Sequence, residues 1–246
     1  MKLEEATWKE VDTYLQHHND IIIPTGSTEQ HGPMGLIGTD AICASHIANG
    51  AGKMANIYVA PTLAYTPAPF NMAFPGTMSI SQPLFKALVL EIVEGLMAQG
   101  FKSIYFLNGH GANLEPLHEV QKHCISAHIR IKSWWEFDQV NQLRQRYYGD
   151  WEGMHATPSE ISITQATHRT ISPGEAADPP KKLSLQYMKD HSGDRHGPPD
   201  QHRQQFPDGR VGSHSALATP EHGHELLEAA ALAVAEDITG FRQRKN

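Results

Sequence analysis

The feature that most constrains the fold is an apolar strand that runs directly into a rigid loop carrying ionisable side chains. The strand is predicted at 21–23, where three isoleucines follow one another, and the loop at 24–38 holds four glycines and two prolines. Glu29, His31 and Asp40 lie on this connection, and a helix begins close to Asp40. Glycine and proline fix particular backbone shapes, and shaped loops that carry ionisable groups are typical of functional sites. The pattern predicts a metal-dependent enzyme.

Strand and helix patterns alternate along the rest of the chain. Strands are predicted at 21–23, 57–60, 103–107 and 128–134, with helices at 8–15, 41–54, 79–99, 114–127 and 219–240. In the third helix, Leu84, Leu88, Ile92 and Leu96 are expected on the inward face. Such alternation indicates an α/β fold, a three-layer α/β/α sandwich with a mostly parallel central sheet. We expect a single domain over residues 1–246.

One stretch, at about 172–215, interrupts this regularity. It is rich in proline, glycine, histidine and charge, and it shows little periodicity. Irregular excursions of this length inside a compact domain tend to be lids, interface arms or mobile segments. Six of the chain's sixteen histidines lie in or just after it, and we expect most of them in solvent rather than on a metal: His191, His196, His202, His214, His222 and His224.

Composition excludes several classes of function. The 246 residues are 39% hydrophobic, enough for a large core, and the net charge of −7 offers nucleic acid no basic field. Cys43 and Cys124 stand outside any CxxC pattern, so neither a disulfide framework nor thiolate-bound zinc is expected. The acidic N-terminus is unlike a signal peptide, and no apolar run of about 18 residues occurs. We therefore expect a soluble cytoplasmic protein without a membrane partner.

Three loops are expected to meet at the carboxyl edge of the sheet, where ligands bind in parallel α/β folds. The second loop, at 108–113, carries His110 directly after a strand, and the third, at 151–160, carries His155 and Glu160 before a helix. Carboxylates and imidazoles together suit Zn²⁺, Mn²⁺ or Fe²⁺. Taken alone, Glu160 is better explained as part of a Thr157–Glu160 capping box.

Other candidates have two interpretations each. Three tryptophans, at 134, 135 and 151, are able to wall a substrate pocket, although isolated tryptophans more often anchor a core or an interface. Ser79 follows a turn at 74–78 and begins a helix, so its hydroxyl is able to meet a polar substrate or simply cap the helix. Both interpretations remain open at this point.

Taken together, the loops resemble the creatininase (creatinine amidohydrolase) family. The resemblance rests on the motifs Pro24–Pro33 with Gly38-Thr39-Asp40, Asn108–Asn113, His155-Ala156 followed by Glu160, and Phe74–Thr77. It implies amide hydrolysis at a site of one or two divalent ions (Zn, Mn or Fe) and a homo-oligomer, commonly a hexamer. By the same resemblance the metal ligands are Glu29, His31, Asp40, His110 and Glu160, with Asp40 bridging, the catalytic residues are His155 and Glu160, and Trp151 lies near the substrate.

Three departures from the family pattern concern the substrate and the second ion. Ala112 stands where creatininases carry a metal-binding glutamate, Met34 replaces a common histidine, and Thr157 replaces a glycine. We therefore do not expect creatinine itself as the substrate, and Ala112 puts full occupancy by a second ion in question.

The predicted activity is metal-dependent hydrolysis of a non-peptide C–N bond, of cyclic amide or formamide type, in a small-molecule amide. A metal-activated water attacks the carbonyl, and His155 passes a proton to the leaving nitrogen. Two alternatives remain open. One is a metal-dependent phosphoesterase, which the scarcity of Lys and Arg near the loops disfavours; the other is a non-catalytic, metal-stapled oligomeric binding protein.

Overall fold

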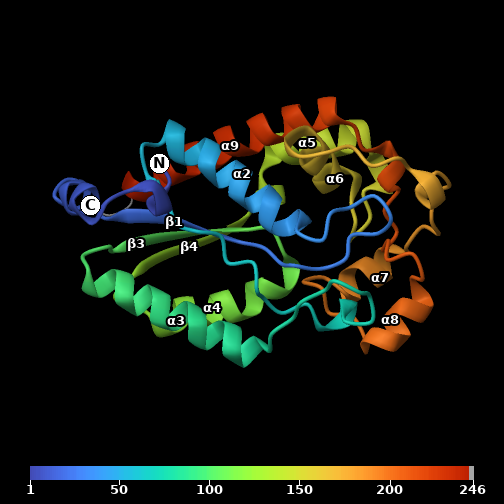
Figure 1. The fold of residues 1–246 in the computed structure, drawn as a ribbon, viewed down its shortest axis with the longest axis horizontal. Helices are drawn as coiled ribbons and strands as arrows, with labels where there is room; N and C mark the ends of the chain where they lie inside the picture. The colour runs from blue at the N-terminus through green and yellow to red at the C-terminus, as the bar shows by residue number, and fades with distance from the viewer. Residues whose placement is uncertain (244–246) are drawn as a thin grey trace.

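A parallel sheet forms the centre of the molecule in the computed structural model, which describes residues 1–243 (Figure 1). Its strands are β1 (Asp20–Thr25), β2 (Tyr58–Val59), β3 (Ser103–Asn108) and β4 (His128–Ser133), in the order β2-β1-β3-β4. Every pairing between these strands is parallel. Thr25 of β1 is level with Asn108 of β3, and Asn108 with Ser133 of β4, so three strands end at one edge. The predicted parallel sheet is confirmed.

Helices cover both faces of the sheet, which confirms the three-layer α/β/α arrangement (Figure 1). One face carries α2 (Thr39–Met54), α5 (Asp138–Tyr147), α6 (Pro158–Thr167) and α9 (Pro220–Gln243). The other carries α3 (Gln82–Ala98) and α4 (Leu114–His123), while α1 (Trp8–Leu15) lies near the amino edge. No helix within residues 1–243 is both long and apolar enough to cross a lipid bilayer.

The strand sequences explain why the sheet is buried on both faces. In β1, Ile22 packs into the core beneath α2 and α9, whereas Ile21 and Ile23 pack into the core beneath α3 and α4. In β3, Tyr105 and Phe106 divide between the two cores in the same way. A strand with two buried faces needs an unbroken apolar run, and β1 and β3 have one.

The structure corrects three expectations about the helices and adds one helix. The N-cap of α3 is Ser81, whose hydroxyl accepts from the Leu84 amide, so Ser79 is not the cap. The fully buried residues of α3 are Phe85, Val89 and Val93. Of the predicted inward face, Leu84 and Leu88 are 56% and 39% exposed, whereas Ile92 and Leu96 are partly buried against the core. The last helix continues past Gly240 to 243, and α5 was not predicted. Val140 is the buried residue of α5, so the helix gives little apolar periodicity.

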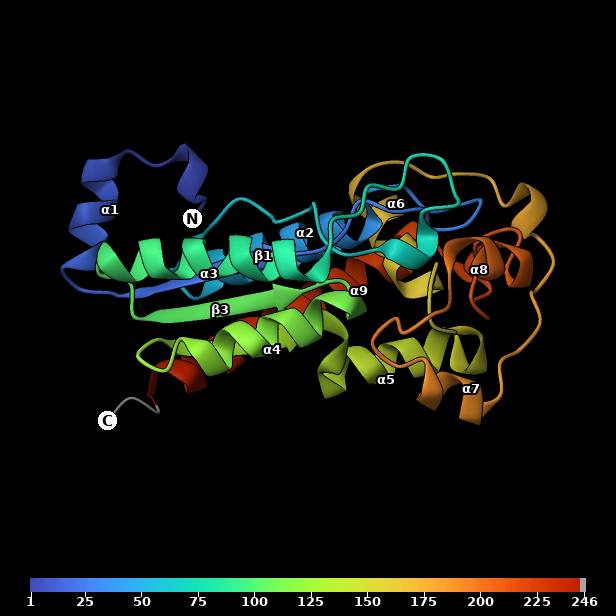
Figure 2. The ribbon, with the colours of Figure 1, turned by 90° about the horizontal axis from the view of Figure 1, so that it is seen from below.

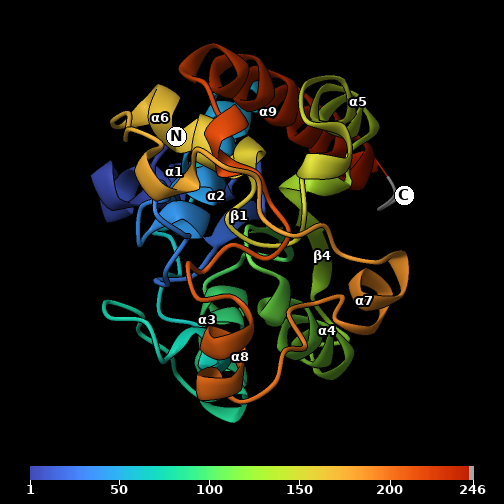
Figure 3. The same cartoon turned by 90° about the vertical axis from the view of Figure 1, so that its right-hand side faces the viewer.

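The excursion at 172–215 is less irregular than expected. It contains α7 (Leu185–Asp190), α8 (Pro199–Gln205) and the 3-10 turn Gly174–Ala176, and it ends where the 3-10 turn Ser215–Leu217 begins. Helices this short carry too few turns for an apolar period to show in the sequence. Both helices lie beyond the carboxyl edge of the sheet (Figures 2 and 3), and α8 packs against the 3-10 turn Pro69–Asn71. The excursion therefore covers the edge where the three loops end.

Candidate metal centre

The three loops meet and bury six ionisable side chains together. Glu29 is 0% exposed, and none of the others exceeds 8%; they are His31, Asp40, His110, His155 and Glu160. Glycines permit the close approach of the loops to α2. A Cβ at Gly26 would overlap the backbone of Ala41, and a Cβ at Gly109 would overlap the Asp40 carbonyl. The structure thus brings together every side chain that the sequence analysis assigned to the metal, with His155 beside them.

Asp40 divides the cluster into two subsites. Its Oδ2 lies 3.0 Å from His110 Nδ1, which is also 3.1 Å from Glu29 Oε1. Its Oδ1 lies 2.9 Å from His31 Nε2, which is 3.9 Å from Glu160 Oε1. We call Glu29, Asp40 and His110 the first subsite, and His31, Asp40 and Glu160 the second subsite. One carboxylate therefore faces both sets of ligands.

Each subsite histidine is held by the backbone through one ring nitrogen. His110 Nε2 lies 2.7 Å from the Pro67 carbonyl, and His31 Nδ1 lies 3.1 Å from the Glu29 carbonyl. Because a carbonyl oxygen only accepts, these nitrogens carry protons, and the opposite nitrogens point at the carboxylates. A metal-binding histidine is usually oriented in this manner.

Charge and burial compete within the cluster. Burial alone lowers the pKa of His31, but Asp40 and Glu160 outweigh it and raise that pKa to about 10. Burial also lowers the pKa of His110, but Glu29 and Asp40 outweigh it and raise that pKa well above its usual range. At Glu160, burial dominates and raises the pKa to about 8 despite the attraction of His31. In the metal-free protein, protons on the histidines thus compensate the carboxylates, and a divalent cation would replace them.

The buried polar atoms of the cluster are consistent with binding of a divalent ion. Glu29 Oε1 is fully buried and faces His110 Nδ1 at 3.1 Å, and the same nitrogen lies 3.0 Å from Asp40 Oδ2. One N–H does not fully satisfy two buried carboxylate oxygens, and metal coordination is one way to satisfy both. Mixed carboxylate and imidazole ligands suit zinc, manganese and iron.

His155 borders both subsites and differs from the other histidines in its charge. Its Nε2 lies 2.7 Å from the Gln30 carbonyl and so carries the proton, while Nδ1 lies 3.8 Å from Glu29 Oε1. Burial and the neighbouring His31 lower the pKa of His155 to about 4, so the ring is neutral at neutral pH. Its free Nδ1 is therefore able to accept a proton, or to coordinate a metal together with Glu29 and His31.

Glu160 is part of the helix cap and also part of the second subsite. The Thr157 amide donates to Glu160 Oε1 at 2.5 Å, and the Glu160 amide donates to Thr157 Oγ1 at 3.3 Å, which completes the capping box of α6. The same Oε1 faces His31 in the second subsite. The cap thus sets the position of the carboxylate.

Other polar side chains support the cluster. Ser27 Oγ donates to Asp40 Oδ2 at 2.8 Å, and Asn71 Nδ2 donates to Glu29 Oε2 at 2.9 Å. Gln30 Nε2 donates to Asn71 Oδ1 at 2.8 Å, so hydrogen bonds link the first loop to the 3-10 turn Pro69–Asn71. Sequence reasoning did not find Asn71, because nothing in the local pattern of the 3-10 turn Pro69–Asn71 indicates a functional role.

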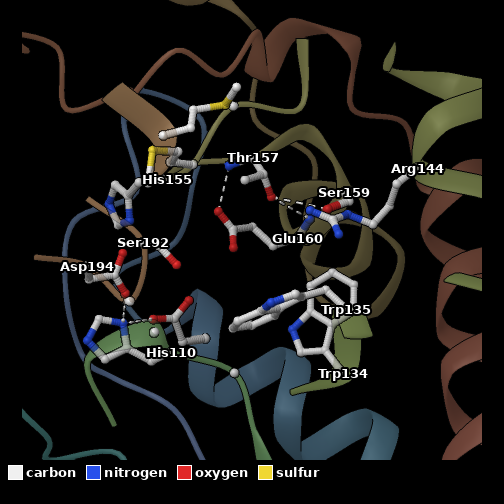
Figure 4. Close-up of a pocket in the computed structure, with 17 residues that line it drawn as sticks. His110, Trp134, Trp135, Arg144, His155, Thr157, Ser159, Glu160, Ser192 and Asp194 are labelled. Atoms are coloured by element: carbon white, nitrogen blue, oxygen red, sulfur yellow. Dashed lines mark hydrogen bonds and ion pairs between the residues drawn. The ribbon is translucent and has the colours of Figure 1, made fainter. Parts of the chain in front are cut away.

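A cavity of about 240 Å³ opens onto the metal centre (Figure 4). Its walls include Trp134 and Trp135 from the end of β4, Arg144 from α5, and residues of the excursion. Arg144 is paired with Glu152, Nε to Oε1 at 3.0 Å. Trp134 also packs in the core at 1% exposure, so it fills both of the roles considered for it. The cavity wall also includes residues that no sequence pattern indicates: Arg144 and the excursion residues Met188, Ser192 and Asp194.

Two predicted substrate-binding residues lie outside this cavity lining. Ser79 Oγ accepts from the Ala68 amide at 2.8 Å and so holds a loop. The Trp151 ring packs against His214, with 5.7 Å between ring centroids, and Lys182 Nζ lies 4.5 Å from its centroid. Contact of either residue with a substrate stays a prediction.

The expectation that most histidines of the excursion lie in solvent is wrong. His224 is exposed, His191, His214 and His222 are half-buried, and the side chains of two others are buried. His202 is 3% exposed and the His196 side chain 1%. Both rings pack against Phe70, with centroid distances of 5.2 and 4.8 Å. The reason is tertiary: α8 folds back onto the loops of the metal centre, which no local pattern reveals.

The fold and the site together define an α/β/α protein with a buried carboxylate and histidine centre suited to divalent metal ions. The chain belongs to the creatininase family, whose model, described as creatinine amidohydrolase, matches residues 4–238. A solved creatinine amidohydrolase (creatininase) has the same fold, with a TM-score of 0.82 at 21% identity over 97% of this chain and 96% of that one. Other solved creatininases are described as manganese and Zn-Zn forms.

Curated relatives match a shorter stretch. The mycofactocin precursor peptide peptidase of Mycolicibacterium smegmatis is 38% identical over 104 residues, 39% of this chain and 41% of the relative. The 3-dehydro-scyllo-inosose hydrolase of Thermotoga maritima is 31% identical over 109 residues, 44% of this chain and 35% of the relative. The match thus spans about two-fifths of the length of these relatives.

Proposed function

We propose that this protein is a metal-dependent amidohydrolase that cleaves a non-peptide C–N bond, of cyclic amide or formamide type, in a small molecule. The observation that carries the proposal is the division of Asp40 between two ligand sets, 3.0 Å from His110 Nδ1 and 2.9 Å from His31 Nε2, beside the neutral His155. Hydrolase names among the relatives and the family model support the reaction class.

The two subsites favour two ions per chain, although Ala112 provides no carboxylate. Each subsite has three potential ligands without any contribution from position 112. Manganese and zinc, the metals named for solved creatininases, suit these ligands, and iron does too. When bound, such ions supply an activated water and polarise a carbonyl oxygen.

His155 is placed to move the proton that hydrolysis requires. As water adds to the carbonyl carbon, Nδ1 accepts its proton, while the Gln30 carbonyl holds the ring through Nε2. The C–N bond then breaks, and the imidazolium returns the proton to the leaving nitrogen. Glu29 is 3.8 Å from Nδ1 and would stabilise the positive charge on the ring between these two steps.

The cavity supports a small substrate. Its volume of about 240 Å³ is below the usual range for drug-sized ligands, roughly 300–1,000 Å³. Trp134 and Trp135 provide flat apolar walls, which suit a planar amide or ring. A peptide, the substrate that the name of one relative indicates, would have to extend beyond this space.

A phosphoesterase fits the site less well. Phosphoryl transfer relies on cationic groups around the phosphate. Among the residues that line the cavity, Arg144 is the one Arg or Lys, and its charge is shared with Glu152. A purely structural metal is also disfavoured, because a closed coordination shell would have no use for a neutral base and a cavity beside it.

We also propose a cytoplasmic homo-oligomer, with the hexamer of the family as the expected size. Leu84 and Leu88, one turn apart on α3, are exposed, and a contact between copies would remove their apolar surface from water. Light scattering coupled to size-exclusion chromatography gives the size directly, and a monomer at all concentrations would contradict the proposal.

The deciding experiment combines metal analysis with a substrate panel. Protein purified without chelator or metal-affinity tag is assayed for Zn, Mn and Fe, then tested on cyclic amides, N-formyl compounds, short peptides and phosphate esters. We expect one or two equivalents of metal and chelator-sensitive release of amine from the first two groups. Cleavage of phosphate esters alone would replace the proposal with the phosphoesterase, and metal binding without any hydrolysis would favour the structural role.

A further inference from the structure

The excursion delivers one more carboxylate to the metal centre. Asp194 Oδ2 lies 3.6 Å from His110 Nδ1, the nitrogen that faces the first subsite, and accepts from the Ala112 amide at 3.1 Å. The Asp194 side chain is 13% exposed and lines the same cavity as His110 and Glu160 (Figure 4). It comes from a segment that sequence reasoning kept apart from the metal.

The local backbone is shaped to place this carboxylate. Gly193 and Asp194 both have left-handed backbone angles, with φ of 75° and 55°. For a residue with a side chain this conformation costs about 1 kcal/mol, so surrounding contacts must hold it. On the facing loop, a Cβ at Gly111 would overlap Asp194 Oδ2. Two glycines thus permit the approach of Asp194 to His110.

Asp194 shares the imidazole nitrogen of His110 with two other buried carboxylates. His110 Nδ1 lies 3.0 Å from Asp40 Oδ2, 3.1 Å from Glu29 Oε1 and 3.6 Å from Asp194 Oδ2. None of the ion pairs of Asp194 within residues 1–243 involves Lys or Arg. Three carboxylates around one imidazole nitrogen form a donor set that suits a divalent cation.

We propose that Asp194 is a further carboxylate ligand of the divalent ion held by Glu29, Asp40 and His110. This inference rests on the metal centre of the proposed function. Donor atoms that share one ion lie about 3–3.5 Å apart when each is about 2.1 Å from the metal. The 3.6 Å from Asp194 Oδ2 to His110 Nδ1 is close to that separation. The excursion would then be fastened to the sheet edge through the metal.

Titration of metal-free protein with Mn²⁺ and with Zn²⁺, by calorimetry, tests the ligand. Asp194→Asn removes the charge and keeps the shape, and asparagine tolerates the left-handed backbone well. We expect the affinity of one ion to fall at least about 10-fold while the other is unchanged. Asp190→Asn, an exposed change in the same segment, is the matched control and should bind both ions like wild type.

Circular dichroism shows whether Asp194→Asn folds, and Gly111→Ala is the second variant. It retains the carboxylate but pushes it away from His110, so it should weaken the same ion. Wild-type affinity for both ions in both variants would overturn the ligand role, while the hydrolase proposal would stand. If no amide substrate is found, the hydrolase proposal fails but the ligand role of Asp194 stands, because the titration measures metal binding without any substrate. A wild-type protein that binds neither metal would overturn both.

Discussion

At the scale of the residue, backbone carbonyls orient the two subsite histidines. Pro67 and Glu29 supply the backbone carbonyls that hold them, and neither carbonyl belongs to a regular helix or strand. The sequence reveals histidines at the right strand ends, but the ring nitrogen that faces the carboxylates depends on these tertiary contacts. His155 is held in the same way by Gln30, yet burial and His31 keep it neutral.

This difference predicts separable defects in two variants. His155→Ala should retain its metal and lose about 10²–10⁴-fold in turnover, because it removes a proton carrier. His110→Ala should lose the ion of the first subsite and the activity together. Elemental analysis and steady-state kinetics on the same preparations check both results.

His168→Ala, an exposed histidine at the end of α6, is the control and should behave like wild type. Full activity in His155→Ala would remove it from the reaction. Loss of metal in His155→Ala would instead assign it to coordination, as its position near Glu29 and His31 permits.

Asn71 is predicted to act on the metal through Glu29. Its Nδ2 donates to Glu29 Oε2 at 2.9 Å, so Asn71→Ala leaves the carboxylate less firmly oriented. We expect metal affinity to fall about 10–100-fold, the usual consequence of removing a partner of a ligand. Calorimetric titration with Mn²⁺ measures it. Asn49→Ala, in α2 and bonded to Ser45, is the control, and equal affinities in the two variants would contradict the role.

At the scale of the element, the start of α6 joins helix stability to the metal centre. Thr157→Val removes the hydroxyl that accepts from the Glu160 amide, at a cost of about 1 kcal/mol in the free energy of unfolding. Because Glu160 Oε1 also faces His31, the same change should weaken the ion of the second subsite. Urea unfolding and metal titration measure the two effects.

The chain offers a matched control in α1. Thr7 and Glu10 form the same capping box there, far along the sheet from the metal centre. Thr7→Val should lose similar stability and keep wild-type metal affinity. If both variants bind metal equally well, the α6 cap has no role beyond the helix.

Helix α8 makes stability depend on pH through His202. Burial lowers the pKa of His202 to about 4, below the value of about 6.5 in an unfolded chain. Between these values the unfolded state binds more protons, so stability is full above pH 6.5 and falls as the pH drops towards 4. The slope for one histidine is at most about 1.4 kcal/mol per pH unit. Glu29 opposes this shift, whereas His191 adds to it.

His202→Phe should flatten this part of the pH profile, because its neighbours Phe70 and Phe206 accept an apolar ring. Urea unfolding at pH 7.5, 6.5 and 5.5 measures the slope. His118→Phe, at an exposed position of α4, is the control and should retain the wild-type slope. An unchanged slope in His202→Phe would show that the acid sensitivity arises elsewhere.

Much of the fold was predictable, because its signals are local. The apolar runs of β1 and β3 and the glycine-rich loops after them give a parallel sheet and place Glu29, Asp40 and His110 at one edge. The rest depends on chain segments that meet only in the folded molecule. Asn71 and Asp194 lie on irregular backbone, where no periodicity indicates which way a side chain faces.

At the scale of the whole molecule, the metal centre joins parts of the chain that are remote in sequence. Loops after β1 and β3, the start of α6 and the excursion all contribute carboxylates or imidazoles to one buried volume. Without a cation, protons on His31 and His110 have to compensate these buried carboxylates, and a divalent ion would replace them. The metal therefore has a structural consequence as well as a chemical one: it should stabilise the folded chain against unfolding.

This consequence is measurable as a shift of the melting temperature. An ion present at 100 times its Kd stabilises the native state by about 2.7 kcal/mol. For a chain of this size 1 kcal/mol corresponds to about 2–4 °C, so removal of one ion should lower Tm by about 5–10 °C. The Tm of His110→Ala should lie near that of chelator-treated wild type and change less when chelator is added, because the first subsite of this variant lacks a ligand. Equal Tm values for the metal-loaded and chelator-treated wild type would contradict the stabilising role of the metal and show that protons on the two histidines compensate the cluster equally well.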